Sequence, residues 1–307
     1  MRNVRQIQLR RGITVAQLIK EMDACGVLGA GKIGKATKLV AEMFKNPDYT
    51  VFLTLAGALV PGGLRSIIAQ LIENEYVNVT ITTGANIVHD MVEALGYKHK
   101  VGLFEADDEY LKRKKLGRIG DIYIEHRAFK DLENWMNLLL EEIPSERRQR
   151  FSPSDLLLEV GRRIDDENSI LATAARKNMP IICPGLVDSI IGFQLWTFSQ
   201  EKKFVLDPFG DLSVLIDKVF EAKKSGVIIL GGGLPKHFAL FANTFREGVD
   251  AAVQVTMDRP EPGGLSGASL EEAISWRKVK NEEKTVTAIC DATIAFPLIV
   301  AAALEEI

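Results

Sequence analysis

The sequence predicts an α/β protein with a Rossmann-like parallel β-sheet and helices on both faces of that sheet. The alternation of two kinds of segment indicates this fold class. Short apolar runs rich in β-branched residues alternate along the chain with amphipathic stretches of helical spacing, and such alternation is typical of parallel strands joined by covering helices. No Pro/Ser-rich linker divides the chain, so residues 1–307 are predicted to form a single domain.

Seven apolar runs are typical of strands, because they are short and rich in β-branched residues. They lie at 50–57, 77–82, 121–125, 180–185, 226–233, 250–257 and 285–290. Amphipathic helices are predicted between them, among others at 63–75, 85–95, 152–164 and 236–245. The charged segment 105–118 is predicted to be a solvated excursion or, alternatively, a partner contact.

The segment GAGKIG fits the dinucleotide pattern G-x-G-x-x-G through Gly29, Gly31 and Gly34. That pattern indicates a nucleotide site only when a strand precedes it and a helix follows. Here the preceding residues have helical spacing, with Thr14 as a plausible N-cap. We therefore predict a glycine-rich turn between two helices, in which Gly26 or Gly29 ends the first helix.

Composition narrows the class of protein further. The chain is 47% hydrophobic and 26% charged, which is an ordinary globular composition. Its formal net charge of −3 argues against nucleic acid as the primary partner. The basic N-terminal segment lacks an apolar signal core, and no apolar run reaches membrane-spanning length. Three widely spaced cysteines predict neither a metal site nor a disulfide framework. We expect a cytoplasmic protein.

Ligands of parallel α/β sheets bind beyond the carboxyl ends of the strands, and most predicted strands here end in glycine. The segment LGGGLPKH precedes a helix, so its glycines either face a phosphate or only form a tight turn. His237 lies in the first turn of that helix, where a structural role and a catalytic role are both open. TTGAN, CDAT and Asp188 suit ribose and phosphate contacts, or serve as turn residues and helix N-caps.

The segment 263–280 predicts a helix that follows a flexible glycine stretch. Ser269 is its expected N-cap, two glutamates fall in its first turn, and Trp276, Lys278 and Lys280 lie near its end. Acids at the start and bases at the end already suit the helix dipole. An aromatic face with a nearby carboxylate, however, is also a usual way to hold an organic ammonium. A lysine beside another cation can act as a nucleophile.

Taken together, these segments resemble the deoxyhypusine synthase family, and its archaeal members most closely. The similarity covers roughly residues 13–304. Six motifs carry it, in the family's order: FLTLAGALVPGGLR, TTGANIVHD, CPGLVD, ILGGGLPKH, DRPEPGGLSGASLEEAISWRK and DATIAFPL.

The resemblance implies an NAD-dependent transferase. In the family, NAD oxidises spermidine, and an enzyme lysine captures the resulting imine and releases 1,3-diaminopropane. The 4-aminobutyl group then passes to one lysine of the initiation factor 5A precursor, and the bound NADH reduces the new imine, which forms deoxyhypusine. The resemblance also implies a homotetramer with sites at subunit interfaces.

Site residues follow from the motifs, again as implications of the resemblance. Lys278 matches the family's nucleophile, and His237 matches a histidine that is a candidate proton acceptor and substrate contact. Trp276 and Glu272 match residues that line the polyamine channel. Seven further positions match NAD contacts: Thr83, Gly84, Ala85, Asp188, Gly232, Asp291 and Ala292.

Some positions depart from the family pattern. Most relatives have Gly where this chain has Arg277, between the tryptophan and the nucleophile. Eukaryotic members carry acidic residues where this chain has Leu265, Phe193 and His89. Two alternatives therefore stay open: a related enzyme that makes homospermidine from putrescine, and a catalytically impaired regulatory homologue.

Overall fold

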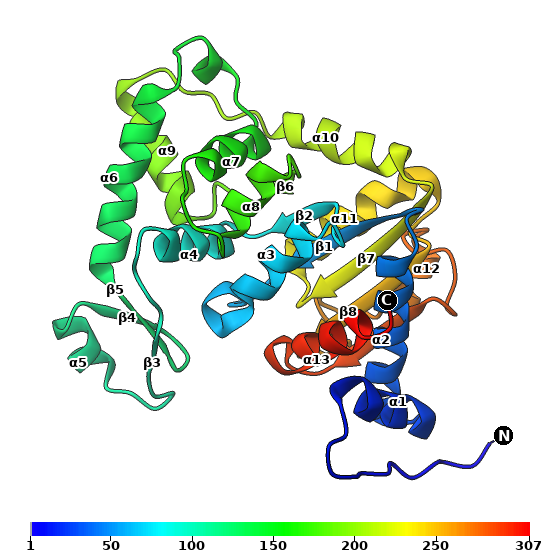
Figure 1. The fold of residues 1–307 in the computed structure, drawn as a ribbon. Helices are drawn as coiled ribbons and strands as arrows, with labels where there is room; N and C mark the ends of the chain where they lie inside the picture. The colour runs from blue at the N-terminus through cyan, green and yellow to red at the C-terminus, as the bar shows by residue number, and fades with distance from the viewer. Residues whose placement is uncertain (1) are drawn as a thin grey trace. The chain divides into compact units, whose positions relative to one another are not determined.

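The computed structural model describes residues 2–307 and divides into two compact units (Figure 1). Unit 1 comprises the residues up to Gly57, Glu75–Ile81 and Leu215–Ile307, and unit 2 comprises Ala58–Asn74 and Thr82–Val214. Compactness does not test whether the two units fold together, so the single domain stays a prediction.

Unit 1 is built on a β-sheet with strand order β2-β1-β7-β8-β9. The pairs β1–β7, β7–β8 and β8–β9 are parallel, as the sequence predicts. Every strand is formed by an apolar run that the sequence identifies, and nearly all strand residues are buried. The strands are β1 (Tyr49–Leu55), β2 (Val79–Thr82), β7 (Lys224–Leu230), β8 (Ala251–Thr256) and β9 (Thr285–Ile289).

Helices cover both faces of this sheet, which confirms the predicted fold class. Gly226 of β7 lies against Met43 of α2 on one face. Gly226 pairs with Ala251, so Gln254 of β8 points to the other face, where it bonds Lys236 of α11. The helices of unit 1 are α1 (Val15–Cys25), α2 (Leu28–Lys45), α11 (Gly233–Ala242), α12 (Leu270–Ser275) and α13 (Ala292–Leu304), and a 3₁₀ turn spans Asn243–Arg246.

GAGKIG lies inside a helix, so it cannot form the strand–turn–helix of a dinucleotide fingerprint. Thr14 caps α1 and Gly26 ends it with φ 72°, both as predicted. The predicted glycine-rich turn is otherwise wrong, because α2 already begins at Leu28 and contains the remaining glycines. A Cβ on Gly31 would come within 2.5 Å of Gly26, and one on Gly34 would overlap Asp23. These glycines therefore allow α1 and α2 to pack closely.

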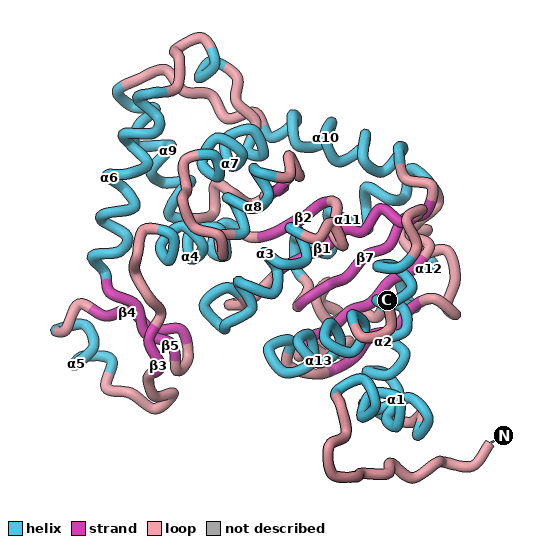
Figure 2. Tube along the Cα trace, in the orientation of Figure 1, coloured by secondary structure: helices cyan, strands magenta, loops and turns pink. Residues whose placement is uncertain are grey.

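Unit 2 is mostly helical and holds a small antiparallel sheet of order β3-β5-β4 (Figure 2). Its strands are β3 (Lys100–Val101), β4 (Leu116–Ile119), β5 (Ile122–Glu125) and, outside that sheet, β6 (Ile181–Ile182). Its helices are α3 (Arg65–Glu73), α4 (Gly84–Ala94), α5 (Asp108–Arg113), α6 (His126–Glu142), α7 (Pro153–Arg162), α8 (Ile170–Arg176) and α9 (Ile190–Glu201), with a π-helical turn at Val60–Leu64 and a 3₁₀ turn at Arg147–Gln149. Helix α10 (Pro208–Glu221) runs from unit 2 into unit 1.

The strand predicted at 121–125 does not join the parallel sheet. It forms β5 in a hairpin with β4, because only Gly120 and Asp121 separate the two strands and Gly120 adopts φ 59°. The charged segment 105–118 contributes α5 and β4, and most of its residues are exposed, as a solvated excursion requires.

A buried carboxylate fixes the helices of unit 2. Asp90 of α4 is 1% exposed and accepts from Arg65 Nε at 2.6 Å and from Ser169 Oγ at 2.9 Å. It also accepts from the backbone N–H groups of Ile170 and Leu171 at the start of α8. A buried charge is tolerated when it is paired and fully bonded in this way.

Across residues 2–307, no helix is both long enough and apolar enough to span a bilayer.

Candidate functional site

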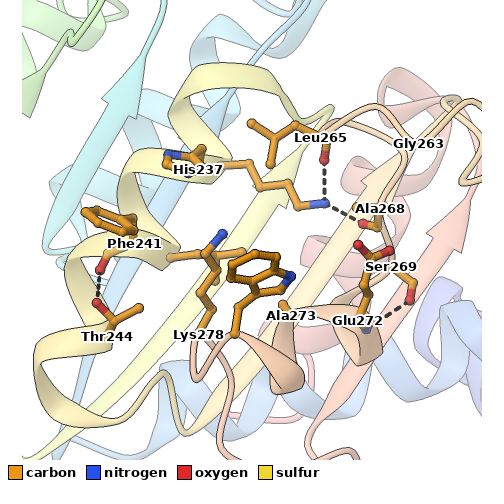
Figure 3. A pocket seen from close by; sticks show the side chains of 13 residues that line it. His237, Phe241, Thr244, Gly263, Leu265, Ala268, Ser269, Glu272, Ala273 and Lys278 are labelled. Atoms are coloured by element: carbon orange, nitrogen blue, oxygen red, sulfur yellow. Dashed lines mark hydrogen bonds between the residues drawn. The ribbon is translucent and has the colours of Figure 1, made fainter.

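A pocket of about 410 Å³ lies beside α11 in unit 1 (Figure 3). Four residues singled out from the sequence line it together: Lys278, His237, Glu272 and Trp276. Much of the remaining lining is apolar and includes Leu240, Phe241, Leu265 and Ala273. The fold thus brings a predicted nucleophile, a base, an acid and an aromatic face into one space.

Helix α12 positions two of these residues. Ser269 is its N-cap, as predicted, and its hydroxyl accepts from the N–H of Glu272 at 3.3 Å. The helix ends at Ser275, which is earlier than the sequence predicts. Lys278 and Lys280 therefore lie beyond the helix rather than near its end within it.

A Schellman turn ends α12 and fixes the direction of Lys278. The N–H of Arg277 donates to Ile274 O at 2.9 Å, and the N–H of Lys278 donates to Ala273 O at 3.0 Å. Arg277 adopts φ 55°, in the left-handed region that glycine prefers. This left-handed residue is why the helix stops early.

Gly248 packs against the backbone of the same loop. It has φ 106°, and a Cβ there would lie 2.7 Å from Val279 N and 2.8 Å from the carbonyl carbon of Lys278. The neighbouring N–H of Val249 donates to Lys278 O at 3.0 Å. The backbone of Lys278 is thus held from two sides, and only its side chain is free to adjust.

The side chain of Lys278 lies over an aromatic ring and faces the imidazole of His237. Its Nζ is 5.6 Å from the ring centroid of Trp276, a cation–π distance. Figure 3 shows Lys278 and His237 directed towards the same space. An amine attached here would therefore have an aromatic face and an imidazole nearby.

His237 is a suitable proton acceptor. It stacks on Phe241, with ring centroids 5.4 Å apart and an interplanar angle of 12°. Burial lowers its pKa, and the positive charge of Lys278 lowers the pKa further. The imidazole is consequently neutral near pH 7, which is the form that accepts a proton.

A second lysine, Lys236, directly precedes His237 and is not among the site residues predicted from the sequence. It is 2% exposed, and burial lowers its pKa to about 8, an effect that Glu272 opposes. Its Nζ donates to Gln254 Oε1 at 3.0 Å and to two backbone carbonyls. The local signal is a lysine in the helix GLPKHFALFA, whose other residues are apolar except for His237.

Three predicted NAD contacts lie in unit 1, after the carboxyl ends of β7 and β9. Asp291 is the N-cap of α13, which confirms the cap interpretation, and its Oδ1 accepts from Thr293 N at 2.7 Å and from Thr293 Oγ1 at 2.6 Å. The residue is exposed, and its Oδ2 is suited to accept from a ribose hydroxyl. Ala292 follows as the first residue of the helix.

The glycines after β7 have an explanation within the chain itself. Gly232 is buried, and a Cβ on it would lie 2.6 Å from Ser266 Cα. A Cβ on Gly231 would overlap Ala56 O. At the end of β1, by contrast, Gly57 has φ 103° and open space around an added Cβ. Room at Gly57 and the exposed carboxylate of Asp291 fit a dinucleotide at this edge of the sheet.

The other four predicted NAD contacts lie in unit 2. Thr83 caps α4 by accepting from Asn86 N at 3.4 Å, and Ala85 is exposed in the first turn. Gly84 packs so closely against Ser189 that a Cβ would overlap it. Asp188 is exposed in the turn before α9, whose N-cap is Ser189. These residues are close together, and their role in cofactor binding stays a prediction.

Within the described part of the chain, no group of three or more His, Cys, Asp or Glu side chains is arranged to hold a metal ion. Cys25, Cys183 and Cys290 are all free thiols.

Sequence comparisons with known proteins agree on one family. The family model for deoxyhypusine synthase matches residues 17–303. The chain is 45% identical over 305 residues to a probable deoxyhypusine synthase of Methanothermobacter thermautotrophicus, which covers 99% of both chains. It is 42% identical to probable deoxyhypusine synthase 1 of Archaeoglobus fulgidus, which covers 97% of both.

Solved structures share the fold. A crystal structure from Entamoeba histolytica, named provisionally as a deoxyhypusine synthase, matches with a TM-score of 0.70 and 20% identity, covering 96% of this chain and 94% of that one. A ternary complex of the protein AgrE with ornithine and NAD⁺ matches with a TM-score of 0.53 and 13% identity, covering 90% of this chain and 33% of that one.

Proposed function

The chain belongs to the deoxyhypusine synthase family, and on that basis we propose that it transfers the 4-aminobutyl group of spermidine to one lysine of the initiation factor 5A precursor. The observation that carries the proposal is the position of Lys278. It lines one pocket with His237, Glu272 and Trp276, which are the residue types that this transfer requires.

Lys278 is the proposed nucleophile. Its unprotonated Nζ attacks the imine carbon of the oxidised polyamine, a new C–N bond forms, and 1,3-diaminopropane leaves. The lysine of the factor then displaces Lys278 in a second transimination. An amine suits this role because one amine can replace another without an additional leaving group.

The remaining pocket residues bind the cation and accept the proton. Glu272 offers a carboxylate and Trp276 an aromatic face to a protonated polyamine, whose methylene groups suit the apolar lining. His237, neutral for the reasons above, accepts a proton as the amine is oxidised.

NAD is the proposed cofactor, and it supplies hydride acceptance from the polyamine and hydride return to the product. Within unit 1, Asp291, Ala292 and Gly232 are proposed to contact it. Within unit 2, the family resemblance makes Thr83, Gly84, Ala85 and Asp188 proposed contacts as well. We further propose that the protein is cytoplasmic and that it forms a homotetramer. Light scattering would test the oligomeric state.

To test the function, the protein is incubated with NAD, labelled spermidine and the factor precursor. The intact mass of the factor is then measured by mass spectrometry. We expect the mass of the factor to rise by one aminobutyl group. In a parallel reaction, putrescine replaces the factor; a homospermidine product with no gain in factor mass would overturn the proposed acceptor.

Lys278→Ala is expected to abolish transfer, because no other group in the proposal forms the enzyme imine. Lys280→Ala is the matched control: Lys280 lies two residues away, is exposed, and pairs with Asp250 at 2.7 Å outside the pocket. Transfer at the unmutated rate by Lys278→Ala would show that the nucleophile is wrongly assigned. Absence of both NAD binding and transfer in the unmutated protein would favour a regulatory homologue.

A further inference from the structure

The segment 263–268 forms one wall of the pocket, and its own backbone hydrogen bonds connect it only to residues 260–264. Gly263, Leu265 and Ala268 line the pocket. A Cβ on Gly263 or Gly264 would meet nothing within 4 Å, so the first part of the segment is not locked by packing. Glycine also has the greatest backbone freedom to lose on ordering. The second part forms a turn, in which the N–H groups of Gly267 and Ala268 donate to Gly264 O and a Cβ on Gly267 would overlap Arg259. These contacts stay within residues 259–268, so they do not attach the wall to the sheet.

Lys236 supplies that attachment from the first turns of α11. Its Nζ donates to Leu265 O at 3.1 Å and to Ala268 O at 2.5 Å, and Figure 3 marks both bonds. The third acceptor is Gln254 Oε1 at 3.0 Å. An ammonium group has three N–H donors, so all three are used within the protein.

Gln254 and Ser266 extend the same cluster. Gln254 of β8 is 0% exposed, and its Nε2 donates to Gly231 O at 3.0 Å and to Ser266 O at 2.8 Å. Ser266 Oγ accepts from Gly233 N at 2.8 Å, at the start of α11. The wall is therefore tied to a central strand and to the helix that carries His237.

The geometry points to Lys236 as a positioning residue that holds the 263–268 wall and thereby sets the width of the polyamine pocket. This inference rests on the proposed function for its effect on catalysis. Lys236 does not contact the reacting atoms itself, because its donors are already occupied. Buried polar clusters of this kind fix a single arrangement only when every member is bonded.

The direct test is hydrogen exchange of the full chain at neutral pH without ligands, followed by peptide mass spectrometry. Lys236→Met keeps an unbranched apolar stem as far as the ε position but removes the ammonium group and its three donors. We expect peptides within 259–268 to exchange about tenfold faster or more, since hydrogen bonds from a charged donor are lost. Lys280→Met is the control and should leave these peptides unchanged. Unchanged exchange in Lys236→Met would overturn the inference.

The functional test separates binding from chemistry. In Lys236→Met, the KM for spermidine should rise about tenfold while the Kd for NAD stays within about twofold, because the wall lies at the polyamine pocket. Borohydride trapping should still label Lys278. A label on Lys236 in the unmutated protein, or an unchanged KM, would contradict a positioning role.

The two proposals fail in different ways. If the unmutated protein transfers nothing, the proposed function fails, while hydrogen exchange still decides whether Lys236 holds the wall. If Lys236→Met does not fold, Lys236→Gln replaces it, a variant that keeps a polar head group but carries no charge and has a shorter side chain. It should speed exchange of the 259–268 peptides by a few fold, and no change there would refute the inference.

Discussion

Replacing Arg277 with glycine and, separately, with alanine measures the strain stored beside the proposed nucleophile. Arg277 has φ 55° at the left-handed position of a Schellman turn. A left-handed conformation costs a residue with a Cβ roughly 1–2 kcal/mol. Glycine removes that cost but loses roughly 0.5–1 kcal/mol more conformational entropy on folding. Alanine keeps the cost, because it also has a Cβ.

We therefore expect Arg277→Gly to be more stable than Arg277→Ala by about 1 kcal/mol, or roughly 2 °C in Tm for a chain of this size. Urea and thermal unfolding of both variants measure the difference. Since both variants lose the same guanidinium, any change in KM for spermidine that they share reports on the charge rather than on the backbone.

A second pair of variants provides an internal control of opposite sign. Ser275 is the last residue of α12 and is helical. There the glycine variant should be less stable than the alanine variant by about 1 kcal/mol. Equal stability of the two Arg277 variants, or the same order at both positions, would refute the argument from left-handed strain.

Two further predictions concern other parts of the chain. Gly34→Ala should lower the free energy of unfolding by roughly 1–3 kcal/mol, because its Cβ would overlap Asp23. Gly29→Ala should raise the free energy of unfolding by about 0.5–1 kcal/mol, because its Cβ meets nothing within 4 Å. Equal effects of the two variants in urea unfolding would show that α1 and α2 do not pack as described. Burial lowers the pKa of His89 from 6.5 to about 4. As the pH falls between these two values, the imidazole is protonated in the unfolded chain before it is protonated in the folded chain. Roughly 2–3 kcal/mol of folding stability is therefore lost between pH 6.5 and 4. His89→Gln should flatten this loss, and an unchanged pH dependence of the urea midpoint would exclude His89 as its source.

Much of the sheet could be predicted from the sequence, because its buried parallel strands are short, continuous apolar runs rich in β-branched residues. The runs at 226–233 and 250–257 correspond to β7 and β8 for this reason. The hairpin of β4 and β5 was missed although its signal is present: the pair Gly120-Asp121 between two short runs is a hairpin turn. The prediction followed the alternation of strands and helices instead.

The grouping of the candidate site residues could be predicted from motifs, but features that depend on backbone distant in sequence could not. Motifs pointed to Lys278 and His237, which the fold brings together. The early end of α12 was not visible, because arginine is a good helix former and the turn is supported by Gly248, far away in sequence. Lys236 was missed because its acceptors come from β8 and from the segment 265–268.

The pairing of β1 with β7 has a consequence for synthesis on the ribosome. Tyr49 is opposite Lys224, and the adjacent ion pair of Lys223 with Asp48 joins residues 175 positions apart. At roughly 5–20 residues per second, β1 leaves the ribosome about 10–35 s before its neighbour exists. During that interval the apolar run YTVFLTL has an unpaired edge, which invites association with other nascent chains. Production of this protein should therefore benefit from slow growth or from abundant chaperones that bind β1 until the second half arrives.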